Sequence, residues 1–507
     1  MWRSVIARGL TATCAVVLAA CGANSVGMSS GSAPSSSPAV TTRSSVADAD
    51  WLRFDYNAQR SGVGPARPGI TAGNLKRLTL RRITVGGTVD SAAIALHATR
   101  IGGRKRDVAI VTTTYGRTIA FDPRRGKKLW AFVPSDIRSY EGSAQITTAT
   151  PIADPDRRFV YAASPDGRIH KLRIANGHEV RSGGWPVRVT SDPTHEKIAS
   201  ALNISGASVI VVTGGYVGDA PPYQGHVVTI NRTSGRVTAV WNSLCSDRHH
   251  LIDPPASCSS SDSAIWARAG AVVEPGSGRI LIATGNAPFN GSTDWGDSVL
   301  ELSRDGRRLL HNWTPANQAQ LNAGDADLGS TAPAILPEVH GLRLAVQGGK
   351  DGMLRLLDLD RLNGTPGGAG PRLGGELQQI PAPGPTDVFT APAVWSHDGR
   401  TYVFVSDGAG TAAYVLGGST PRLHLAWRSS ASGTSPVLAG GLLYVFDPGG
   451  SLDVYEPTSG RELISLPAAP GHWNSPIVTG GRIILPVGDA NDHATTGTID
   501  IYHLPGH

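Results

Sequence analysis

Residues 121–130 read Phe-Asp-Pro-Arg-Arg-Gly-Lys-Lys-Leu-Trp. Apolar residues flank a short polar segment with one glycine, which is the pattern of two β-strands joined by a tight turn. The theme returns at 230–237, Ile-Asn-Arg-Thr-Ser-Gly-Arg-Val, before Trp241, and at 455–463, Tyr-Glu-Pro-Thr-Ser-Gly-Arg-Glu-Leu. A hairpin that recurs in this way predicts a repeat protein built from β-strands.

A second hairpin recurs between copies of the first one. It is clear at 160–169 and 344–354, where Asp-Gly forms the turn, and weaker at 442–452. Together the two hairpins define about eight four-stranded units. Their approximate spans are 87–134, 144–190, 195–244, 259–315, 326–383, 387–430, 433–469 and 471–505.

Repeats of this length with four strands each predict an all-β fold, a single β-propeller of eight blades over residues 51–507. Seven blades is the alternative count. The last unit shows only three strands, at 475–478, 482–487 and 497–503, whereas a lone strand at 75–85 precedes the first unit. We expect this N-terminal strand to complete the last blade and close the ring.

The first 20 residues have the features of a signal peptide. Arg3 and Arg8 precede an apolar stretch, 10–20, that is too short to span a bilayer. Residues 18–22, Leu-Ala-Ala-Cys-Gly, resemble the bacterial lipobox, in which the Cys carries the lipid after cleavage. The resemblance implies lipidation of Cys21, with acyl chains such as palmitate, and an extracytoplasmic protein anchored to the cell membrane. An ordinary secretory signal near a Cys is the alternative.

Residues 21–50 are predicted to be a disordered tether, because Ser, Ala, Gly, Thr and Pro dominate and aromatic residues are absent. Loss of the signal peptide would lower the net charge from +6 to +4. The basic residues are scattered and form no stripe with stacking aromatics, so we expect no nucleic acid partner.

The cysteine content predicts one disulfide. Cys14 would leave with the signal peptide and Cys21 would be lipidated, so only Cys245 and Cys258 remain to pair in an oxidising compartment. A metal site that combines these two cysteines with His249 and His250 is the alternative.

The turn glycine followed by Trp130 or Trp241 resembles the tryptophan-docking repeat of propellers of the pyrroloquinoline quinone (PQQ) type. Further matches are 51–62, 263–270, 283–290 and 348–352, so the resemblance covers about 51–505. It implies that such Trp side chains pack between adjacent blades. We expect Trp130, Trp241, Trp313 and Trp427 in the core, whereas Trp295 and Trp473 lie in loop-like sequence and are candidates for the channel mouth.

Dehydrogenases of this family hold PQQ beside Ca²⁺ in the central channel. The resemblance matches Asn286 to a metal ligand, Asp327 to the ligand and catalytic base, and Lys350 to the basic contact of the quinone. The adjacent Cys pair of many members is missing. Residues 214–219, Gly-Gly-Tyr-Val-Gly-Asp, lack the expected Glu, and Asp219 is the only replacement carboxylate there. The alternative is that Asn286 and Asp327 make turn hydrogen bonds and Lys350 is a hairpin charge.

These observations favour a non-catalytic binding platform at the cell envelope, without a cofactor, whose partner is a protein or another envelope component. The alternative is a PQQ- and Ca²⁺-dependent quinoprotein dehydrogenase that acts on alcohols or sugars. The missing Glu and the missing Cys pair favour the platform, and the fold by itself does not choose between the two.

Overall fold

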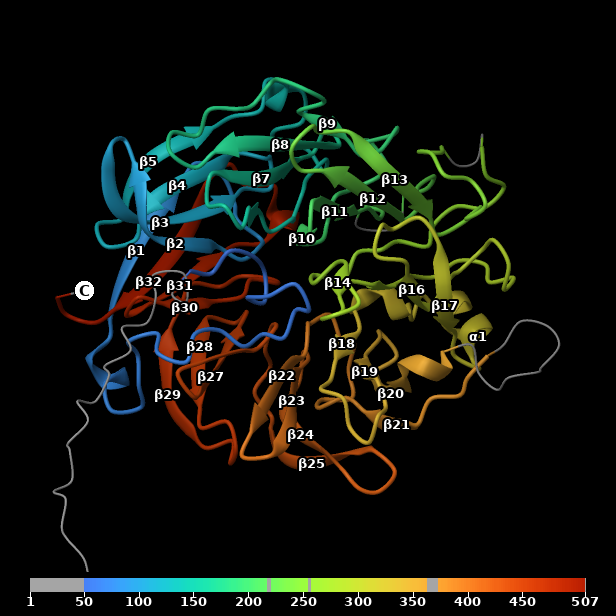
Figure 1. Ribbon diagram of the computed structural model, residues 1–507. Coiled ribbons are helices and arrows are strands. Elements are labelled where there is room, and N and C mark those ends of the chain that lie inside the picture. The colour runs from blue at the N-terminus through green and yellow to red at the C-terminus, as the bar shows by residue number, and fades with distance from the viewer. Residues whose placement is uncertain (1–49, 217–219, 254–256, 363–372, 507) are drawn as a thin grey trace, which may run out of the picture. The chain divides into compact units, whose positions relative to one another are not determined.

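The strands form eight antiparallel sheets of four strands each, arranged around a central axis (Figure 1). The computed structural model describes residues 50–216, 220–253, 257–362 and 373–506. The predicted all-β propeller and its count of eight blades are confirmed. The predicted signal peptide, Cys21 and residues 21–49 of the predicted tether lie outside the described residues. Asp50, the last residue of the predicted tether, is buried and pairs with Arg157 at 2.9 Å, so it belongs to the folded part. Among the residues described, no helix is long and apolar enough to cross a membrane.

Each blade runs outward from the axis, so its strands fall into four classes. The innermost strands are β2 (Ile94–Ile101), β6 (Ile152–Ala153), β10 (Asn203–Ser205), β14 (Val272–Val273), β18 (Ala334–Ile335), β22 (Ala393–His397), β26 (Val437–Ala439) and β30 (Ile477–Thr479). The second strands are β3 (Arg104–Thr112), β7 (Phe159–Ser164), β11 (Ser208–Val212), β15 (Ile280–Ala283), β19 (Leu344–Gln347), β23 (Arg400–Ser406), β27 (Leu442–Asp447) and β31 (Arg482–Val487).

The outer half of each blade completes the sheet. The third strands are β4 (Thr118–Asp122), β8 (Arg168–Arg173), β12 (His226–Asn231), β16 (Val299–Leu302), β20 (Met353–Asp358), β24 (Thr411–Gly417), β28 (Ser451–Tyr455) and β32 (Gly497–His503). The outermost strands are β5 (Lys127–Phe132), β9 (Val187–Arg188), β13 (Val237–Asn242), β17 (Leu309–Trp313), β21 (Gln378–Pro381), β25 (Arg422–Ser429), β29 (Glu462–Pro467) and β1 (Thr79–Val85). Helical elements are short: α1 (Gln318–Ala323) and 3₁₀ turns at Leu75–Arg77, Ile137–Ser139, Leu328–Ser330, Leu359–Arg361 and Ala490–Asp492.

The first strand of the chain closes the ring, as predicted. β1 pairs antiparallel with β32 along its whole length, from Thr79 opposite His503 to Val85 opposite Gly497. Arg82 strengthens this junction through two hydrogen bonds to the Asp500 carboxylate, at 2.6 and 2.8 Å. The last blade therefore combines strands from both parts of the chain, and β1 covers the outer edge of β32.

The repeated glycine turn also explains how neighbouring blades pack. Gly177 has φ +74°, a backbone conformation that favours glycine, and a Cβ there would lie 2.5 Å from the Trp130 ring of the preceding blade. Gly460 stands in the same relation to Trp427, with φ +70° and 2.4 Å. The indole N–H of Trp130 donates to the carbonyl of Ile174 at 2.8 Å. The expected packing of these Trp side chains between blades is confirmed.

The segment 51–69 closes the channel on one side, and it crosses the centre of the ring (Figure 1). It hydrogen-bonds the innermost strands of five blades through Trp51 to Ala95, Leu52 to Ala153, Ala58 to Val273, Ser61 to Val394 and Gly62 to Leu438. Arg60 is buried in this segment and donates to the carbonyls of Phe54, Ala201, Leu202 and Ala269. We name residues 51–69 the N-terminal seal.

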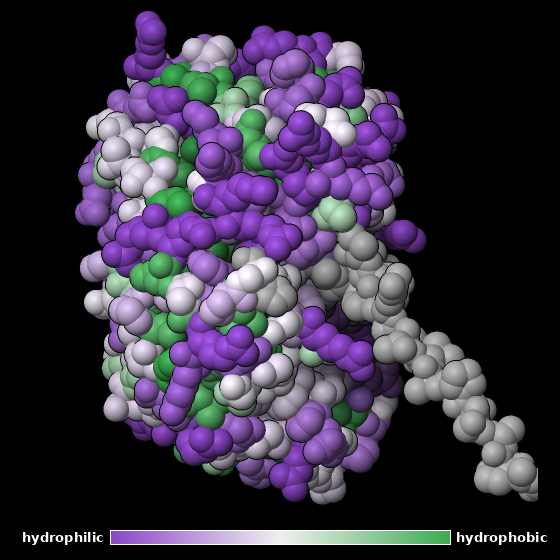
Figure 2. Space-filling view, turned by 90° about the vertical axis from the view of Figure 1, so that its left-hand side faces the viewer, coloured by the Kyte–Doolittle hydropathy of each residue, from purple (hydrophilic) through white to green (hydrophobic). Residues whose placement is uncertain are grey.

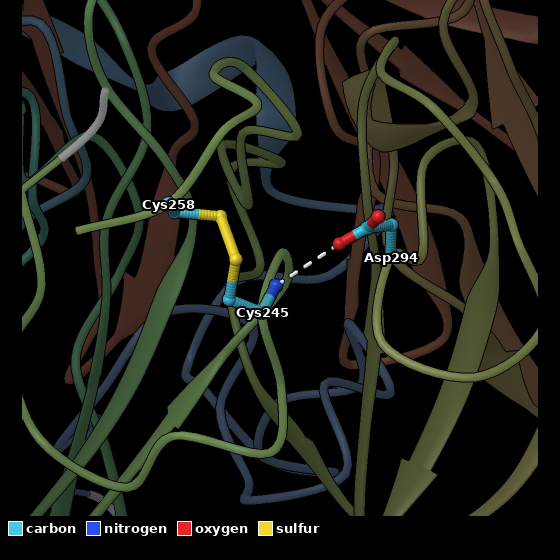
Figure 3. Close-up of side chains that lie close together, drawn as sticks. All are labelled: Cys245, Cys258 and Asp294. Carbon is cyan, nitrogen blue, oxygen red and sulfur yellow. Dashed lines mark hydrogen bonds between the residues drawn. A yellow bond between two sulfur atoms is a disulfide. The ribbon is translucent and has the colours of Figure 1, made fainter. Parts of the chain in front are cut away.

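The predicted disulfide between Cys245 and Cys258 is confirmed (Figure 3). The backbone N–H of Cys245 donates to the Asp294 carboxylate at 3.1 Å, which ties this loop to the next blade. His249 and His250 are exposed. Because both sulfur atoms are consumed by the bond, the alternative of a metal site with these histidines is wrong.

Candidate functional site

A cavity of about 410 Å³ lies on the propeller axis. Its wall follows a positional rule: the residue four positions before an innermost strand faces the cavity in six of the eight blades. These residues are Asp90, Thr148, Ala199, Arg268, Phe389 and Trp473. The N-terminal seal binds several of the same strands one residue after they begin, so it closes the channel beneath the cavity.

Asp327 and Lys350 form an ion pair in the cavity wall. Lys350 Nζ lies 2.8 Å from Asp327 Oδ2 and 2.9 Å from Asp325 Oδ1. The indole N–H of Trp266 donates to Asp327 Oδ1 at 3.1 Å. Burial raises the pKa of Asp327 to about 6, although Lys350 and the Trp266 hydrogen bond act to lower it. Burial acts to lower the pKa of Lys350, but the two carboxylates outweigh it and the pKa is raised.

Asp90 forms a second charged centre, which joins three blades. It is 1% exposed, and its carboxylate accepts hydrogen bonds from Arg268 Nη2 at 3.0 Å and from the backbone N–H of Trp473 and Ala490. His472 Nδ1 lies 2.8 Å from the same carboxylate. Burial acts to raise the pKa of Asp90, yet Arg268 and His472 dominate and hold it well below its usual range.

An arc of aromatic rings covers part of the wall between the two charged centres. Ring centroids of Trp266 and Phe389 are 5.7 Å apart, and those of Phe389 and Trp473 are 4.7 Å apart. His472 continues the series at 4.8 Å from Trp473. Such a surface suits the flat or apolar face of a small organic molecule.

Two further cavity residues keep polar atoms uncommitted. Lys197 Nζ and the side-chain amide of Asn286 make no hydrogen bond or ion pair within the described residues, although both residues line the cavity. Because buried polar groups are normally satisfied, these two side-chain groups remain available to a ligand.

The structure brings the three sequence-predicted site residues together, because Asn286, Asp327 and Lys350 line one cavity. Lys350 lies in the turn between β19 and β20, and its ammonium pairs with Asp327. Trp473 lines the cavity as expected. Trp295 does not: it is 6% exposed and packs in a core cluster of the third and fourth blades, where its N–H donates to Ser246.

Sequence reasoning missed Lys197, Asp90, Arg268, His472 and the role of Trp266. All of them precede an innermost strand within a few residues. What identifies them is their position relative to the innermost strand of each blade. This position can be assigned once those strands have been located.

The described residues do not fit the Ca²⁺ ion of the PQQ enzymes. Both carboxylate oxygens of Asp327 already have partners, and Lys350 balances its charge. At Gly215 a Cβ would lie 2.5 Å from the Tyr223 ring, so no Glu side chain is accommodated there. Of the predicted ligand set only Asn286 remains, whereas Ca²⁺ takes six to eight oxygens. The candidate replacement Asp219 lies outside the described residues.

The fold and the cavity define a class, that of eight-bladed propellers with a ligand-sized cavity on the axis. Residues 116–309 match the family model described as outer membrane protein assembly factor BamB, a match that covers less than half of the chain. No curated protein sequence matches the chain. The resemblance to the PQQ-type propeller repeat is confirmed by this family match and by the folds of solved structures.

The solved structures with this fold include both enzymes and an assembly factor. A quinohemoprotein alcohol dehydrogenase from Comamonas testosteroni is 16% identical, with a TM-score of 0.65 over 90% of this chain and 81% of that chain. One from Pseudomonas putida HK5 is 13% identical, with a TM-score of 0.66 over 91% and 81%. BamB from Moraxella catarrhalis is 12% identical, with a TM-score of 0.50 over 85% and 99%. Identities this low show the shared fold alone.

Proposed function

We propose that this chain is a lipid-anchored cell-envelope protein whose propeller binds a small molecule in its central cavity and carries out no quinone-dependent oxidation. The observation that carries this proposal is the cavity itself. It combines an aromatic arc with two uncommitted polar groups, Lys197 and Asn286, on the axis of a rigid ring. A protein or another envelope component as a further partner stays a prediction.

The outer surface supports the choice of the cavity as the binding site. The exposed large hydrophobic side chains of the described residues are spread over different parts of the chain: Leu80, Val133, Val237, Leu373 and Leu425. Hydrophilic side chains cover most of the face in Figure 2, and apolar atoms are interspersed among them. That face therefore presents no broad apolar patch of the kind that marks a protein interface.

Protein reconstituted with PQQ and Ca²⁺ is expected to show no turnover of primary alcohols or aldoses. The physical reason is that Asp327 is already paired with Lys350, so the described residues leave too few oxygen ligands for the cation. The measurement is a dye-linked dehydrogenase assay together with a thermal shift. Turnover that disappears in Asp327→Asn would favour the dehydrogenase alternative, which the convergence of Asn286, Asp327 and Lys350 on one cavity supports.

Cys21→Ser is expected to move the protein from the membrane fraction to the soluble fraction. The apolar stretch 10–20 is too short to hold the chain in a bilayer, so the lipid supplies the anchor. Fractionation followed by immunoblotting measures the change. Cys14→Ser is the matched control, because that residue leaves with the signal peptide, and it should stay with the membranes. Equal membrane recovery of both variants would contradict the lipid anchor.

A further inference from the structure

Lys197 is the one cation in the cavity wall, among the described residues, that has no carboxylate partner. Arg268 pairs with Asp90, and Lys350 pairs with Asp325 and Asp327. Lys197 is 9% exposed and lines the cavity. Its backbone is fixed by two hydrogen bonds to Gly214, at 2.7 and 3.0 Å, so the side chain projects from an ordered position.

The surroundings of Lys197 increase the fraction of its side chain that is a neutral amine. Burial, followed by the nearby charge of Arg268, lowers the pKa of Lys197 to about 8, whereas Asp90 and Asp489 act in the opposite direction. His472, Tyr216 and Tyr223 are the other titratable groups of this part of the wall. At pH 7 about one Lys197 amine in ten is then neutral, against fewer than about one in a thousand for an ordinary lysine.

The charge of the wall argues against an anion as the occupant. Three acidic residues, Asp90, Asp325 and Asp327, face three basic residues, Lys197, Arg268 and Lys350. The cavity thus has no excess of positive charge, and its aromatic arc suits an uncharged molecule. A neutral carbonyl compound suits both the balanced charge of the wall and its aromatic surface. Its carbonyl carbon is also an electrophile that a neutral amine attacks.

We propose that Lys197 is a nucleophile that captures a small aldehyde or ketone in the central cavity as an imine. The inference rests on the proposed function of the cavity as a ligand site. The amine nitrogen attacks the carbonyl carbon, a C=N bond replaces the C=O bond, and the oxygen leaves as water with the two amine protons. The step needs no oxidant or reductant. Such capture is a recognised use of desolvated lysines.

The test is reductive trapping of benzaldehyde with cyanoborohydride at pH 7, read by peptide mass spectrometry. We expect Lys197 to be labelled at least ~10-fold more than Lys350 and Lys171 in the same molecules. Both are internal controls. Lys350 lies in the cavity but is ion-paired, and Lys171 is buried elsewhere and donates to the Arg232 carbonyl at 2.6 Å. Labelling of Lys197 should level off above about pH 8.

Two variants complete the test. Lys197→Met should remove the main adduct, whereas Lys127→Met, on the exposed outermost strand β5, should leave it unchanged. Equal labelling of all lysines in the wild-type protein would overturn the inference without relying on any variant. A thermal shift with benzaldehyde but no Lys197 adduct would overturn the imine and leave the cavity as a ligand site. The absence of both the thermal shift and the adduct would overturn the imine and would also contradict the proposed ligand site.

Discussion

Arg60→Ala is expected to lower the free energy of unfolding by about 3–5 kcal/mol, because it removes the buried centre of the N-terminal seal. The guanidinium of Arg60 donates to four backbone carbonyls, which belong to the seal and to the starts of two blades. Those carbonyls would lose their partners in a place that water does not reach freely, and each unsatisfied group carries a cost.

Urea unfolding followed by tryptophan fluorescence measures this change. Arg67→Ala is the matched control, since Arg67 is an exposed arginine in the same segment, and its effect should stay below about 0.5 kcal/mol. Similar losses in the two variants would show that Arg60 does not hold the seal against the blades.

Asp90→Ala is expected to destabilise the protein by about 3–5 kcal/mol at pH 7. The carboxylate is buried and binds Arg268, His472 and two backbone N–H groups, so its removal leaves the Arg268 charge without a partner. Asp156→Ala is the matched control. That residue makes an exposed ion pair with Arg232 at 2.8 Å, and the loss there should be below about 1 kcal/mol.

The difference between wild type and Asp90→Ala should depend on pH with a defined sign. The folded-state pKa of Asp90 lies below the value of about 3.9 that it has in the unfolded chain. The contribution of Asp90 to the free energy of unfolding is therefore fully present above about pH 5. It is lost as the pH falls through the folded-state pKa. Unfolding curves at pH 7, 5 and 3 measure this. A difference that grows toward acid would contradict the role of Asp90 as an ionised centre.

The fold was predictable because its signals are local. The turn glycine at 126 and its counterpart at 235 each stand at the same place in a blade. The sequence also shows one extra strand before the first blade and one strand too few in the last blade, and the extra strand completes that blade. The seal was not predicted, because its partners extend from Ala95 to Gly481 and most of its contacts are one or two backbone hydrogen bonds. Nothing in the local sequence of 51–69 specifies such distant partners.

The candidate site was predicted only where a family motif covers it. Asn286 and Lys350 lie in motifs that resemble the PQQ-type propellers, and Asp327 was located from its distance to the next blade. Lys197 and Asp90 precede the innermost strands of their blades, in segments that carry no motif. Asp90 and Arg268 are 178 residues apart in the sequence, and only the closed ring makes them neighbours.

The pairing of β1 with β32 has a consequence for how the chain is made. Synthesis produces the seal and β1 before the blades, yet their partners near Gly481 and at 497–503 follow only after seven blades have been made. During elongation β1 remains an open strand edge, which is a hazard for aggregation. Contacts of such long sequence separation also form slowly. A chain that lacks the last blade would leave β1 without a partner, so the ring closes only after β32 has been made.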